Sequence, residues 1–267
     1  MNLAICSLAS GSSGNCYVVY SEDGCILVDA GISAKQIREG LLKLGIGETD
    51  LKAVLVTHDH SDHVKGLGTL LKRTDAKIYA NEKTFKGIDA PISEERWCGF
   101  ETGSSFELAG MLVETFSVSH DTADPVGYSF SRGGKRISIV TDTGIVTPAV
   151  FGHIKSADIL VLESNHDENI LRMGRYPWFL KQRILGEKGH LSNEAAAFAL
   201  AEALKQEKEA GSVRDKMVLL AHLSKENNFP EMAMATMNNI LEEKNLLSRN
   251  LKIQILSRSD VSPIYFI

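Results

Sequence analysis

The chain has 267 residues, of which 43% are hydrophobic and 24% charged, and its formal net charge is −5. This balance is typical of a globular protein with a sizeable core and excludes a disordered or fibrous chain. No apolar run approaches the ~18–20 residues that span a bilayer, so we expect no membrane segment. Met1–Leu8 lacks the basic and apolar regions of a secretory signal. The four cysteines show no C-x-x-C spacing. These features favour a cytoplasmic protein with reduced thiols.

The apolar patterns predict strands and helices along the whole chain. Strands are predicted at Leu3–Ala9, Cys16–Tyr20, Cys25–Val28, Ala53–Thr57, Lys77–Ala80, Met111–Val118, Tyr128–Ser131, Arg136–Thr141, Ile159–Glu163, Met217–His222 and Lys252–Leu256. Helices are predicted after the N-cap Ser33, through Leu67–Leu71, at Asn193–Glu209 and at Pro230–Lys244. No linker, repeat or low-complexity tract interrupts residues 1–267. We therefore predict a single domain of the α/β class, a four-layer αββα sandwich.

The segment His58-Asp59-His60-Ser61-Asp62-His63 follows a predicted strand and is the most informative part of the sequence. His58 and His60, two residues apart, can turn toward the same side and offer imidazole nitrogens to one metal ion. Asp62 and His63 are close enough in sequence to serve a second ion. Imidazole and carboxylate ligands suit Zn²⁺, Mn²⁺ or Fe²⁺. The segment therefore predicts a metal site rather than an ordinary polar loop.

This pattern resembles the H-x-H-x-D-H signature of the metallo-β-lactamase superfamily, whose fold is an αββα sandwich. Other residues resemble the remaining superfamily motifs, in order and at plausible spacing. Asp29 ends a predicted strand and resembles an aspartate that braces the metal loop. His120, Asp142 and His222 each end or follow a predicted strand and resemble the further metal ligands.

The resemblance implies two divalent metal ions per chain, Zn²⁺ or Mn²⁺, with Fe²⁺ as a further option. It assigns His58, His60 and His120 to the first ion, Asp62, His63 and His222 to the second, and Asp142 as a bridge. Two such ions can share a hydroxide and stabilise both oxygens of a phosphoryl displacement. Position 142 is Asp rather than Cys. This departs from the thiolate-using lactamases and favours a hydroxide-bridged hydrolase.

Gly189-His190-Leu191-Ser192 opens a predicted helix and is similar to a His-Ser/Thr motif in nucleases such as tRNase Z. By that similarity His190 would protonate the departing oxygen, with Glu163 fixing its tautomer. The alternative is a surface histidine at a helix entry.

Leu171–His190 combines basic residues, among them Arg172 and Arg175, with aromatic ones. Basic groups for phosphates beside aromatics for stacking favour a nucleic-acid platform. The alternative is an amphipathic helix whose aromatics pack inward. Further donors to a substrate are predicted at Ser13, Asn15, Ser224 and Asn227, although these residue types also serve ordinary turns.

Five segments together resemble the YycJ (also WalJ) subfamily of this superfamily: residues 10–16, 58–63, 163–166, 189–192 and 222–228. The resemblance spans nearly the whole chain and implies a cytoplasmic DNA exonuclease, acting 5′-to-3′ on duplex DNA, with a role in DNA repair. The interval between Asp142 and Glu163 is too short for the β-CASP insertion of RNase J-type nucleases. In the implied dinuclear phosphodiesterase, a metal-bridging hydroxide attacks phosphorus. Asp62 orients or deprotonates it, and His190 assists the leaving group.

The residues leave other functions open. An RNA-processing nuclease of tRNase Z type and a thioesterase or esterase of glyoxalase II type are alternatives. The basic and aromatic segment argues against the small substrate but does not separate DNA from RNA. A mononuclear iron oxygenase would bind only the first ion, so Asp62, His63 and His222 would have no function in it. A scaffold protein would not need a complete set of metal ligands. Neither the physiological metal, nor exonuclease against endonuclease mode, nor the oligomeric state follows from the sequence.

Overall fold

The computed structural model describes residues 3–212 and 214–267, so Met1 and Asn2 of the segment inspected for a signal lie outside it. The chain separates into two compact units. Unit 1 comprises Met1–Phe116, Thr122–Lys135 and Ser257–Ile267, and unit 2 comprises Ser117–Asp121 and Arg136–Leu256. A single domain over residues 1–267 stays a prediction.

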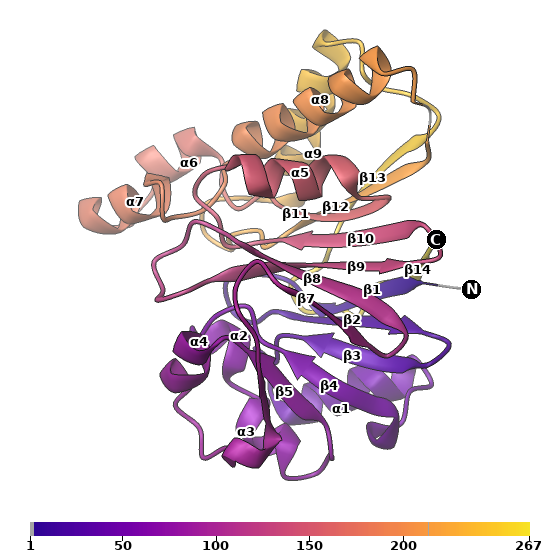
Figure 1. Cartoon of the computed structure of the whole chain (residues 1–267). Coiled ribbons are helices and arrows are strands. Elements are labelled where there is room, and N and C mark those ends of the chain that lie inside the picture. The colour runs from indigo at the N-terminus through magenta and orange to yellow at the C-terminus, as the bar shows by residue number, and fades with distance from the viewer. Residues whose placement is uncertain (1–2, 213) are drawn as a thin grey trace. The chain divides into compact units, whose positions relative to one another are not determined.

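Each unit combines strands with helices (Figure 1). Unit 1 holds β1 (Ala4–Ala9), β2 (Cys16–Ser21), β3 (Gly24–Val28), α1 (Ala34–Lys43), the 3₁₀ turn η1 (Glu48–Asp50), β4 (Leu51–Leu55), α2 (Ser61–Val64), α3 (Leu67–Leu71), β5 (Lys77–Ala80), α4 (Glu82–Gly87), the 3₁₀ turn η2 (Glu94–Arg96), β6 (Trp97–Gly99), β7 (Ser105–Leu108), most of β8 (Met111–Ser117), β9 (Val126–Arg132) and β14 (Tyr265–Phe266). Unit 2 holds most of β10 (Lys135–Val140), α5 (Pro148–Ser156), β11 (Ile159–Glu163), α6 (Glu168–Met173), α7 (Trp178–Leu185), α8 (Asn193–Glu209), β12 (Lys216–Ala221), α9 (Pro230–Glu243) and β13 (Leu251–Ile255).

The strands form two seven-stranded sheets, with the orders β14-β1-β2-β3-β4-β5-β6 and β13-β12-β11-β10-β9-β8-β7. In the first sheet, β14, β1, β2 and β3 pair antiparallel, whereas β3 to β6 pair parallel. In the second, β7 and β8 pair antiparallel, and β10 to β13 pair parallel. These sheets, flanked by helices, confirm the predicted αββα fold class. Between Asp142 and Glu163 lie only α5 and its connections, so there is no β-CASP insertion.

Helices α1 and α3 supply one side of the core of unit 1. Ile37 and Leu41 from α1 and Leu67 and Leu70 from α3 pack with the buried strand residues of the first sheet. Ser33 caps α1 as predicted, since its hydroxyl accepts from the Gln36 amide. This amphipathic arrangement buries one face of each helix and leaves the other in water.

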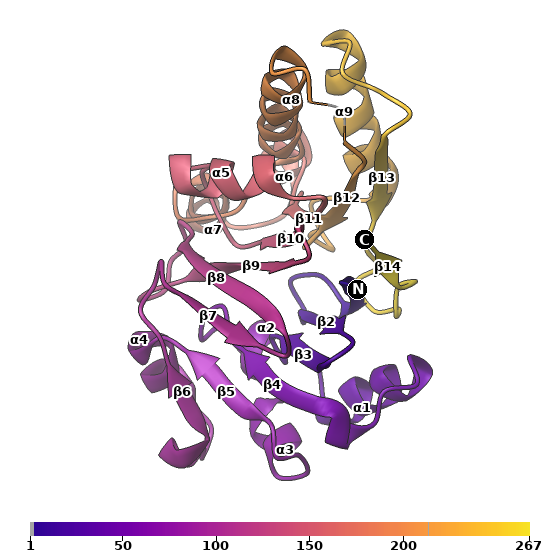
Figure 2. The ribbon, with the colours of Figure 1, turned by 45° about the vertical axis from the view of Figure 1, so that its right-hand side comes forward.

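Unit 2 follows the same layering on a parallel sheet. Helix α8 packs against α5 and α9, and α9 packs against β13; Figure 2 shows these helices on one side of β11 to β13. Strands β11 and β12 are buried almost throughout, as expected when parallel strands are covered. Among residues 3–212 and 214–267, no helix combines the length and apolar character needed to cross a bilayer.

An ion pair connects α8 to the first residue of β12. The Glu207 carboxylate lies 2.9 Å from Lys216 Nζ, whose side chain is 1% exposed. Burial alone would raise the pKa of the Glu207 carboxyl, but bonds from Arg214 and Lys216 hold that pKa below its usual value. The carboxylate therefore stabilises the fold above the unfolded-state pKa, and this stability is lost as the pH falls through the folded-state pKa.

We expect Glu207→Gln to lower the free energy of unfolding by about 2 kcal/mol at pH 7, because Lys216 loses its buried counter-charge. Below about pH 4 the difference from the wild type should shrink, since the wild-type carboxyl is then being protonated. Urea denaturation at pH 7 and pH 3.5 measures both values. An equal difference at the two pH values would contradict the prediction.

Candidate metal centre and hydrolytic site

The carboxyl ends of parallel strands hold most of the candidate residues, and each unit has its own set. In unit 1, Asp29 follows β3 and the His58 cluster lies just after the neighbouring strand β4. In unit 2, Asp142 follows β10, Glu163 ends β11 and His222 follows β12, three adjacent parallel strands. The carboxyl ends of adjacent parallel strands lie at one edge of a sheet. Residues far apart in the sequence are therefore neighbours.

Asp29 connects the strand ends of unit 1. Its carboxylate accepts hydrogen bonds from the Thr57 amide (2.8 Å) and hydroxyl (2.9 Å), and it lies 2.7 Å from His63 Nδ1. Burial raises the pKa of the Asp29 carboxyl, while the His63 and Thr57 contacts act in the opposite direction. A carboxylate on Nδ1 fixes a histidine ring and leaves Nε2 as the ligand atom. Asp29 thus contacts Thr57 and His63, and its role at a metal site stays a prediction.

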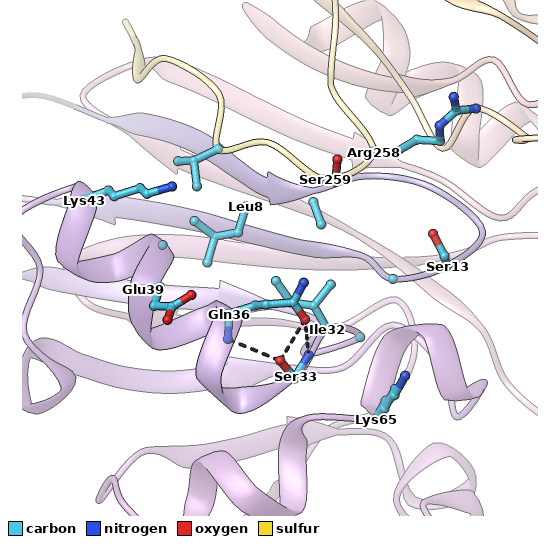
Figure 3. Close-up of a pocket in the computed structure, with 15 residues that line it drawn as sticks. Leu8, Ser13, Ile32, Ser33, Gln36, Glu39, Lys43, Lys65, Arg258 and Ser259 are labelled. Atoms are coloured by element: carbon cyan, nitrogen blue, oxygen red, sulfur yellow. Dashed lines mark hydrogen bonds between the residues drawn. The ribbon is translucent and has the colours of Figure 1, made fainter.

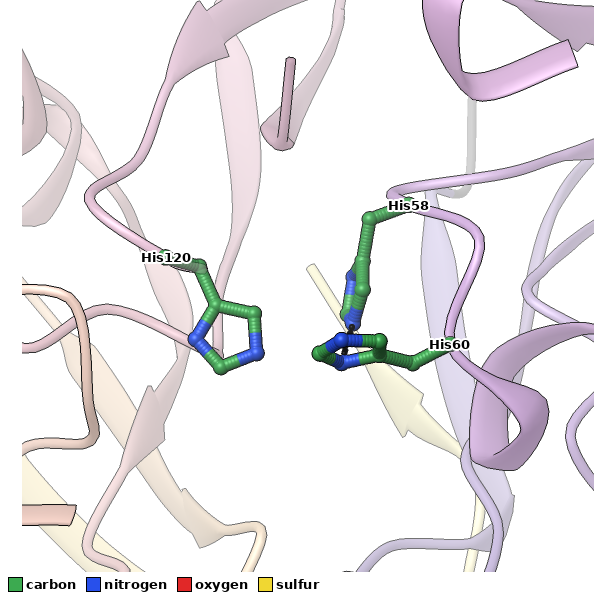
Figure 4. A group of neighbouring side chains, drawn as sticks. All are labelled: His58, His60 and His120. Atoms are coloured by element: carbon green, nitrogen blue, oxygen red, sulfur yellow. Dashed lines mark hydrogen bonds between the residues drawn. The ribbon is translucent and has the colours of Figure 1, made fainter. Parts of the chain in front are cut away.

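His58 and His60 have the spacing of two ligands to one ion. His58 Nδ1 lies 3.0 Å from the Thr57 hydroxyl, and His58 Nε2 lies 3.2 Å from His60 Nδ1 (Figure 4). Two nitrogens bound to one tetrahedral ion at about 2.0–2.1 Å stand roughly 3.3 Å apart. The two imidazoles therefore fit a shared divalent metal without rearrangement.

Asp62 and His63 lie against the Gly/Ser-rich turn that follows β1. The Asn15 amide donates to the Asp62 carbonyl (2.8 Å), and Asn15 Nδ2 lies 3.1 Å from His63 Nε2. Gly31 permits this approach, because a Cβ there would come within 1.6 Å of the Asp62 carbonyl oxygen. Asn15, predicted to bind substrate, is buried and contacts Asp62 and His63, two of the candidate ligands of the second ion.

Glu163 contacts two histidines of unit 2. Its Oε1 lies 2.8 Å from Nδ1 of both His190 and His222, and its Oε2 accepts from the amides of Thr143 (2.9 Å) and Leu191 (3.3 Å). Burial alone would raise the pKa of this carboxyl, but the two histidines outweigh burial and hold that pKa well below its usual range. The predicted contact of Glu163 with His190 is present. Its contact with His222 was not predicted.

Asp142 and His120 complete the set in unit 2. His222 Nδ1 lies 3.5 Å from Asp142 Oδ1, and His120 Nε2 lies 3.8 Å from the same oxygen. His120 Nδ1 lies 3.1 Å from the Gly189 carbonyl, and burial lowers the pKa of the His120 ring. A neutral imidazole that donates Nδ1–H to a carbonyl offers its Nε2 lone pair as a metal ligand.

Three of these residues hold a left-handed backbone conformation that residues other than glycine rarely adopt. The φ angle is 63° at Asp29, 56° at Asp142 and 56° at His222. Each lies one or two residues after a strand, and such a conformation costs on the order of 1–3 kcal/mol. It turns the chain sharply out of the sheet. Strain at strand ends of this kind is typical of residues whose side chains serve a site.

The predicted substrate-binding residues in turns differ in exposure. Ser13 is exposed, whereas Ser224 and Asn227 are buried in the turn after His222. The Asn227 amide donates to the Ser224 hydroxyl (3.2 Å), and the Asn227 carbonyl accepts from the Asp167 amide (3.0 Å). Ser224 and Asn227 thus stabilise that turn, and their assignment as substrate ligands stays a prediction.

The basic and aromatic segment forms α6 and α7 of unit 2. Trp178 is 62% exposed and Phe179 is 72% exposed, so the alternative in which these rings pack inward is wrong. Lys181, in contrast, is buried and donates to two backbone carbonyls at the end of α6. It therefore holds α6 in place and does not meet solvent. Arg172 and Arg175 are exposed.

Two sets of contacts that position the candidate ligands were not predicted from the sequence. Thr57 touches Asp29, His58 and His63, and its place directly before the first histidine was the only local signal. The Glu163–His222 contact joins residues 59 apart in the chain, and no local pattern marks it.

Comparison with known proteins gives the family. Residues 25–209 match the description "Beta-lactamase superfamily domain". Exodeoxyribonuclease YycJ of Bacillus anthracis is 41% identical over 247 residues, which cover 91% of each chain. Exodeoxyribonuclease WalJ of Streptococcus pneumoniae is 39% identical over 263 residues, 96% of this chain and 95% of that one. The metallo-β-lactamase fold protein YhfI of Bacillus subtilis matches with a TM-score of 0.69 at 15% identity, over 98% of this chain and 99% of that one, a likeness of fold alone.

The fold and the clustered histidines and carboxylates define a metal-dependent hydrolase. The chain belongs to the β-lactamase superfamily and, within it, to the family of the YycJ and WalJ proteins. The predicted family, fold class and enzyme class are confirmed, and the His/Asp clusters are suitable for metal binding.

Proposed function

We propose that the protein is a dinuclear metal-dependent phosphodiesterase that removes nucleotides from the 5′ end of double-stranded DNA. The observation that carries the chemistry is the pair of 2.8 Å contacts from Glu163 to His190 and His222. One carboxylate there orients both a proposed metal ligand and a proposed acid. The two relatives named exodeoxyribonucleases support DNA as the substrate.

The proposed ligands are imidazoles and carboxylates, a set that Zn²⁺ and Mn²⁺ both accept. As the family resemblance implies, His58, His60 and His120 would hold the first ion, Asp62, His63 and His222 the second, with Asp142 shared. The 3.2 Å spacing of His58 Nε2 and His60 Nδ1 and the burial of His63 and His222 support this set. When bound, two ions acidify a water molecule and neutralise charge on the phosphate.

The residues of the chain supply orientation and the proton. We assign to Asp62, whose side chain is 23% exposed, the orientation of the attacking water. His190 is assigned the protonation of the leaving oxygen. Its Nδ1 lies 2.8 Å from Glu163 Oε1, which orients the ring and leaves Nε2 as the atom that would carry the proton to the leaving oxygen.

The exposed face of α6 and α7 supports a nucleic-acid substrate. Trp178 and Phe179 offer rings for base stacking, and Arg172 and Arg175 offer charge for phosphates. The segment is joined to the acid, since the His190 amide donates to the Ile184 carbonyl of α7 (3.0 Å). A thioesterase for a small substrate would have no use for such a surface.

The test uses chelated protein to which Mn²⁺ or Zn²⁺ is restored separately. Duplex DNA, single-stranded DNA and RNA of one sequence, each with a 5′ phosphate and a label at one end, are the substrates. We expect mononucleotide release from the 5′ end of the duplex. Preferred cleavage of RNA would show that RNA, not DNA, is the substrate. Internal cuts would show an endonuclease instead of an exonuclease. Hydrolysis of a thioester alone would refute the nuclease function.

We also place this activity in the cytoplasm. Cys6, Cys16 and Cys25 are buried free thiols, and Cys98 is free and partly buried. Burial raises the pKa of Cys25 to about 11, which keeps it in the unreactive thiol form. Reduced thiols of this kind suit a reducing compartment.

A further inference from the structure

A pocket of about 460 Å³ lies entirely within unit 1, beside the short helix α2 that carries Asp62 and His63. Its walls come from the end of β1, the turn after β1, one face of α1, Lys65 and the segment after β13. Figure 3 shows Lys43, Lys65 and Arg258 arranged around it, with Leu8 and Ile32 between them. The pocket therefore has an aliphatic floor and a cationic rim.

The charge of the rim favours an anion. Three cations line the pocket, and the single carboxylate among the lining residues, Glu39, lies 3.9 Å from Lys35 on the same helix. In the part of the chain that the structure describes, the ammonium groups of Lys43 and Lys65 have no ion-pair or hydrogen-bond partner. Two uncompensated cations at the edge of a concave surface attract phosphate groups.

The shape of the pocket favours a chain of phosphates over a single one. Ser33, Gln36, Gly40 and Lys43 recur at three- or four-residue intervals, so the pocket follows one face of α1. Helix α1 has 10 residues and is about 15 Å long. One strand of B-form DNA carries a phosphate per roughly 3.4 Å of axis, so a few nucleotides fit along this face.

The pocket is connected to the proposed metal loop through backbone contacts. Gly31, a lining residue, donates to the Asn15 carbonyl (2.8 Å), and the Asn15 amide donates to the Asp62 carbonyl (2.8 Å). Lys65, at the other wall, follows His63 by two residues. A strand whose cleaved phosphate lies at Asp62 and His63 would have its neighbouring phosphates within reach of Lys65.

We propose that this pocket binds the sugar-phosphate backbone of the substrate strand next to the cleavage site, with Lys65 nearer the metal loop and Lys43 further along α1. The proposal rests on the proposed nuclease function and names the surface that this function uses in unit 1. Ser13, predicted from the sequence to bind substrate, lines the same pocket. The aliphatic floor of Leu8, Ile32 and Val261 would pack against sugars rather than read bases.

The test measures DNA binding without catalysis. Metal-free protein is titrated into a fluorescent, 5′-phosphorylated duplex at KCl concentrations between 50 and 200 mM, and anisotropy gives the dissociation constant. The double variant Lys43→Ala/Lys65→Ala should bind about tenfold more weakly at 0.1 M KCl. The slope of log K against log [KCl] should become shallower by about two. Both lysines are exposed, so the variant should fold.

The matched control is Lys83→Ala/Lys86→Ala on α4, which removes the same charge from exposed positions outside the pocket. We expect the control to keep the wild-type slope. A second variant, Ser259→Trp, fills the mouth of the pocket at an exposed position without changing charge and should also weaken binding. Equal slopes for the pocket and control variants, wild-type binding by Ser259→Trp, or no binding by the wild type would each overturn the proposal.

A free deoxynucleoside 5′-monophosphate is the other source of such a phosphate. If calorimetry shows that the pocket variant loses affinity for the mononucleotide while its duplex salt slope is unchanged, the pocket holds product and the proposal is wrong. Failure of the proposed function gives a different result. The wild type supplied with Mn²⁺ or Zn²⁺ would then cleave no nucleic acid, whatever the binding data show.

Discussion

Asp62→Asn is expected to lower the rate of DNA cleavage by roughly 10³-fold or more, equivalent to about 4 kcal/mol of lost transition-state stabilisation. The variant should bind one equivalent of Mn²⁺ or Zn²⁺ tightly instead of two, because a neutral amide replaces a charged ligand of the second ion. Asn matches the shape of Asp and keeps the backbone bond to Asn15 (2.8 Å), so the fold should be unaffected.

Asp62 is a cleaner position for this test than the adjacent histidine. His63 is fully buried and lies 2.7 Å from Asp29. Its removal would leave the buried Asp29 carboxylate with only the Thr57 amide and hydroxyl as partners and without its imidazole contact, at a cost of about 3–5 kcal/mol. Loss of activity in a His63 variant would therefore mix unfolding with loss of metal.

Asp59→Asn is the matched control, since it makes the same chemical change three residues earlier in the sequence, at a residue outside the proposed ligand set. We expect it to keep both metal equivalents and wild-type activity. Metal content measured by mass spectrometry of desalted protein, together with the cleavage rate, decides the matter. A fully active Asp62→Asn enzyme with one ion would refute the dinuclear mechanism.

Glu163→Gln is expected to weaken binding of one ion by about 10- to 100-fold, because Glu163 fixes the ring of the proposed ligand His222. It should also lower the free energy of unfolding by about 3 kcal/mol at neutral pH. The buried carboxylate accepts four bonds, from two histidines and two amides, and an amide side chain cannot accept them all. The rate of DNA cleavage should fall because both metal affinity and stability are lower.

Two comparisons separate the roles of Glu163. His190→Ala should keep both ions and the wild-type metal affinity while slowing turnover by about 10²–10⁴-fold, the usual contribution of general acid catalysis. Glu168→Gln, an exposed change on α6, should alter stability by less than about 0.5 kcal/mol. Wild-type metal affinity and stability in Glu163→Gln would contradict the organising role. Loss of an ion in His190→Ala would make His190 a ligand instead of the acid.

Much of the fold follows from patterns that fit within a few residues. Lys77–Ala80, Ile159–Glu163 and Asn193–Glu209 have the predicted bounds, and the other predicted strands differ by one or two residues at one or both ends. Continuous apolar runs and helical spacing with a capping serine are local signals, so the sequence reveals them directly. Helices α2 and α4 to α7 were not predicted as such, since they are short or lack a clear apolar face.

The sequence by itself determined the class of chemistry. The spacing His58-x-His60-x-Asp62-His63 puts four donors into six residues at a strand end, and Asp29, Asp142 and His222 could be recognised by their places after strands. Candidate metal ligands of this kind are marked by residue type and short spacing. They can therefore be read before any tertiary contact is known.

Only the tertiary structure decided which groups surround these donors and which surface is exposed. It joined Glu163 to His222, buried Lys181 while exposing Trp178 and Phe179, and formed a cationic pocket from segments near residues 8, 31, 65 and 258. Strand order and helix packing bring such residues together, and both depend on the whole core. The free energy that selects one strand order and one helix packing comes from the whole core, so no short segment of the sequence predicts these contacts.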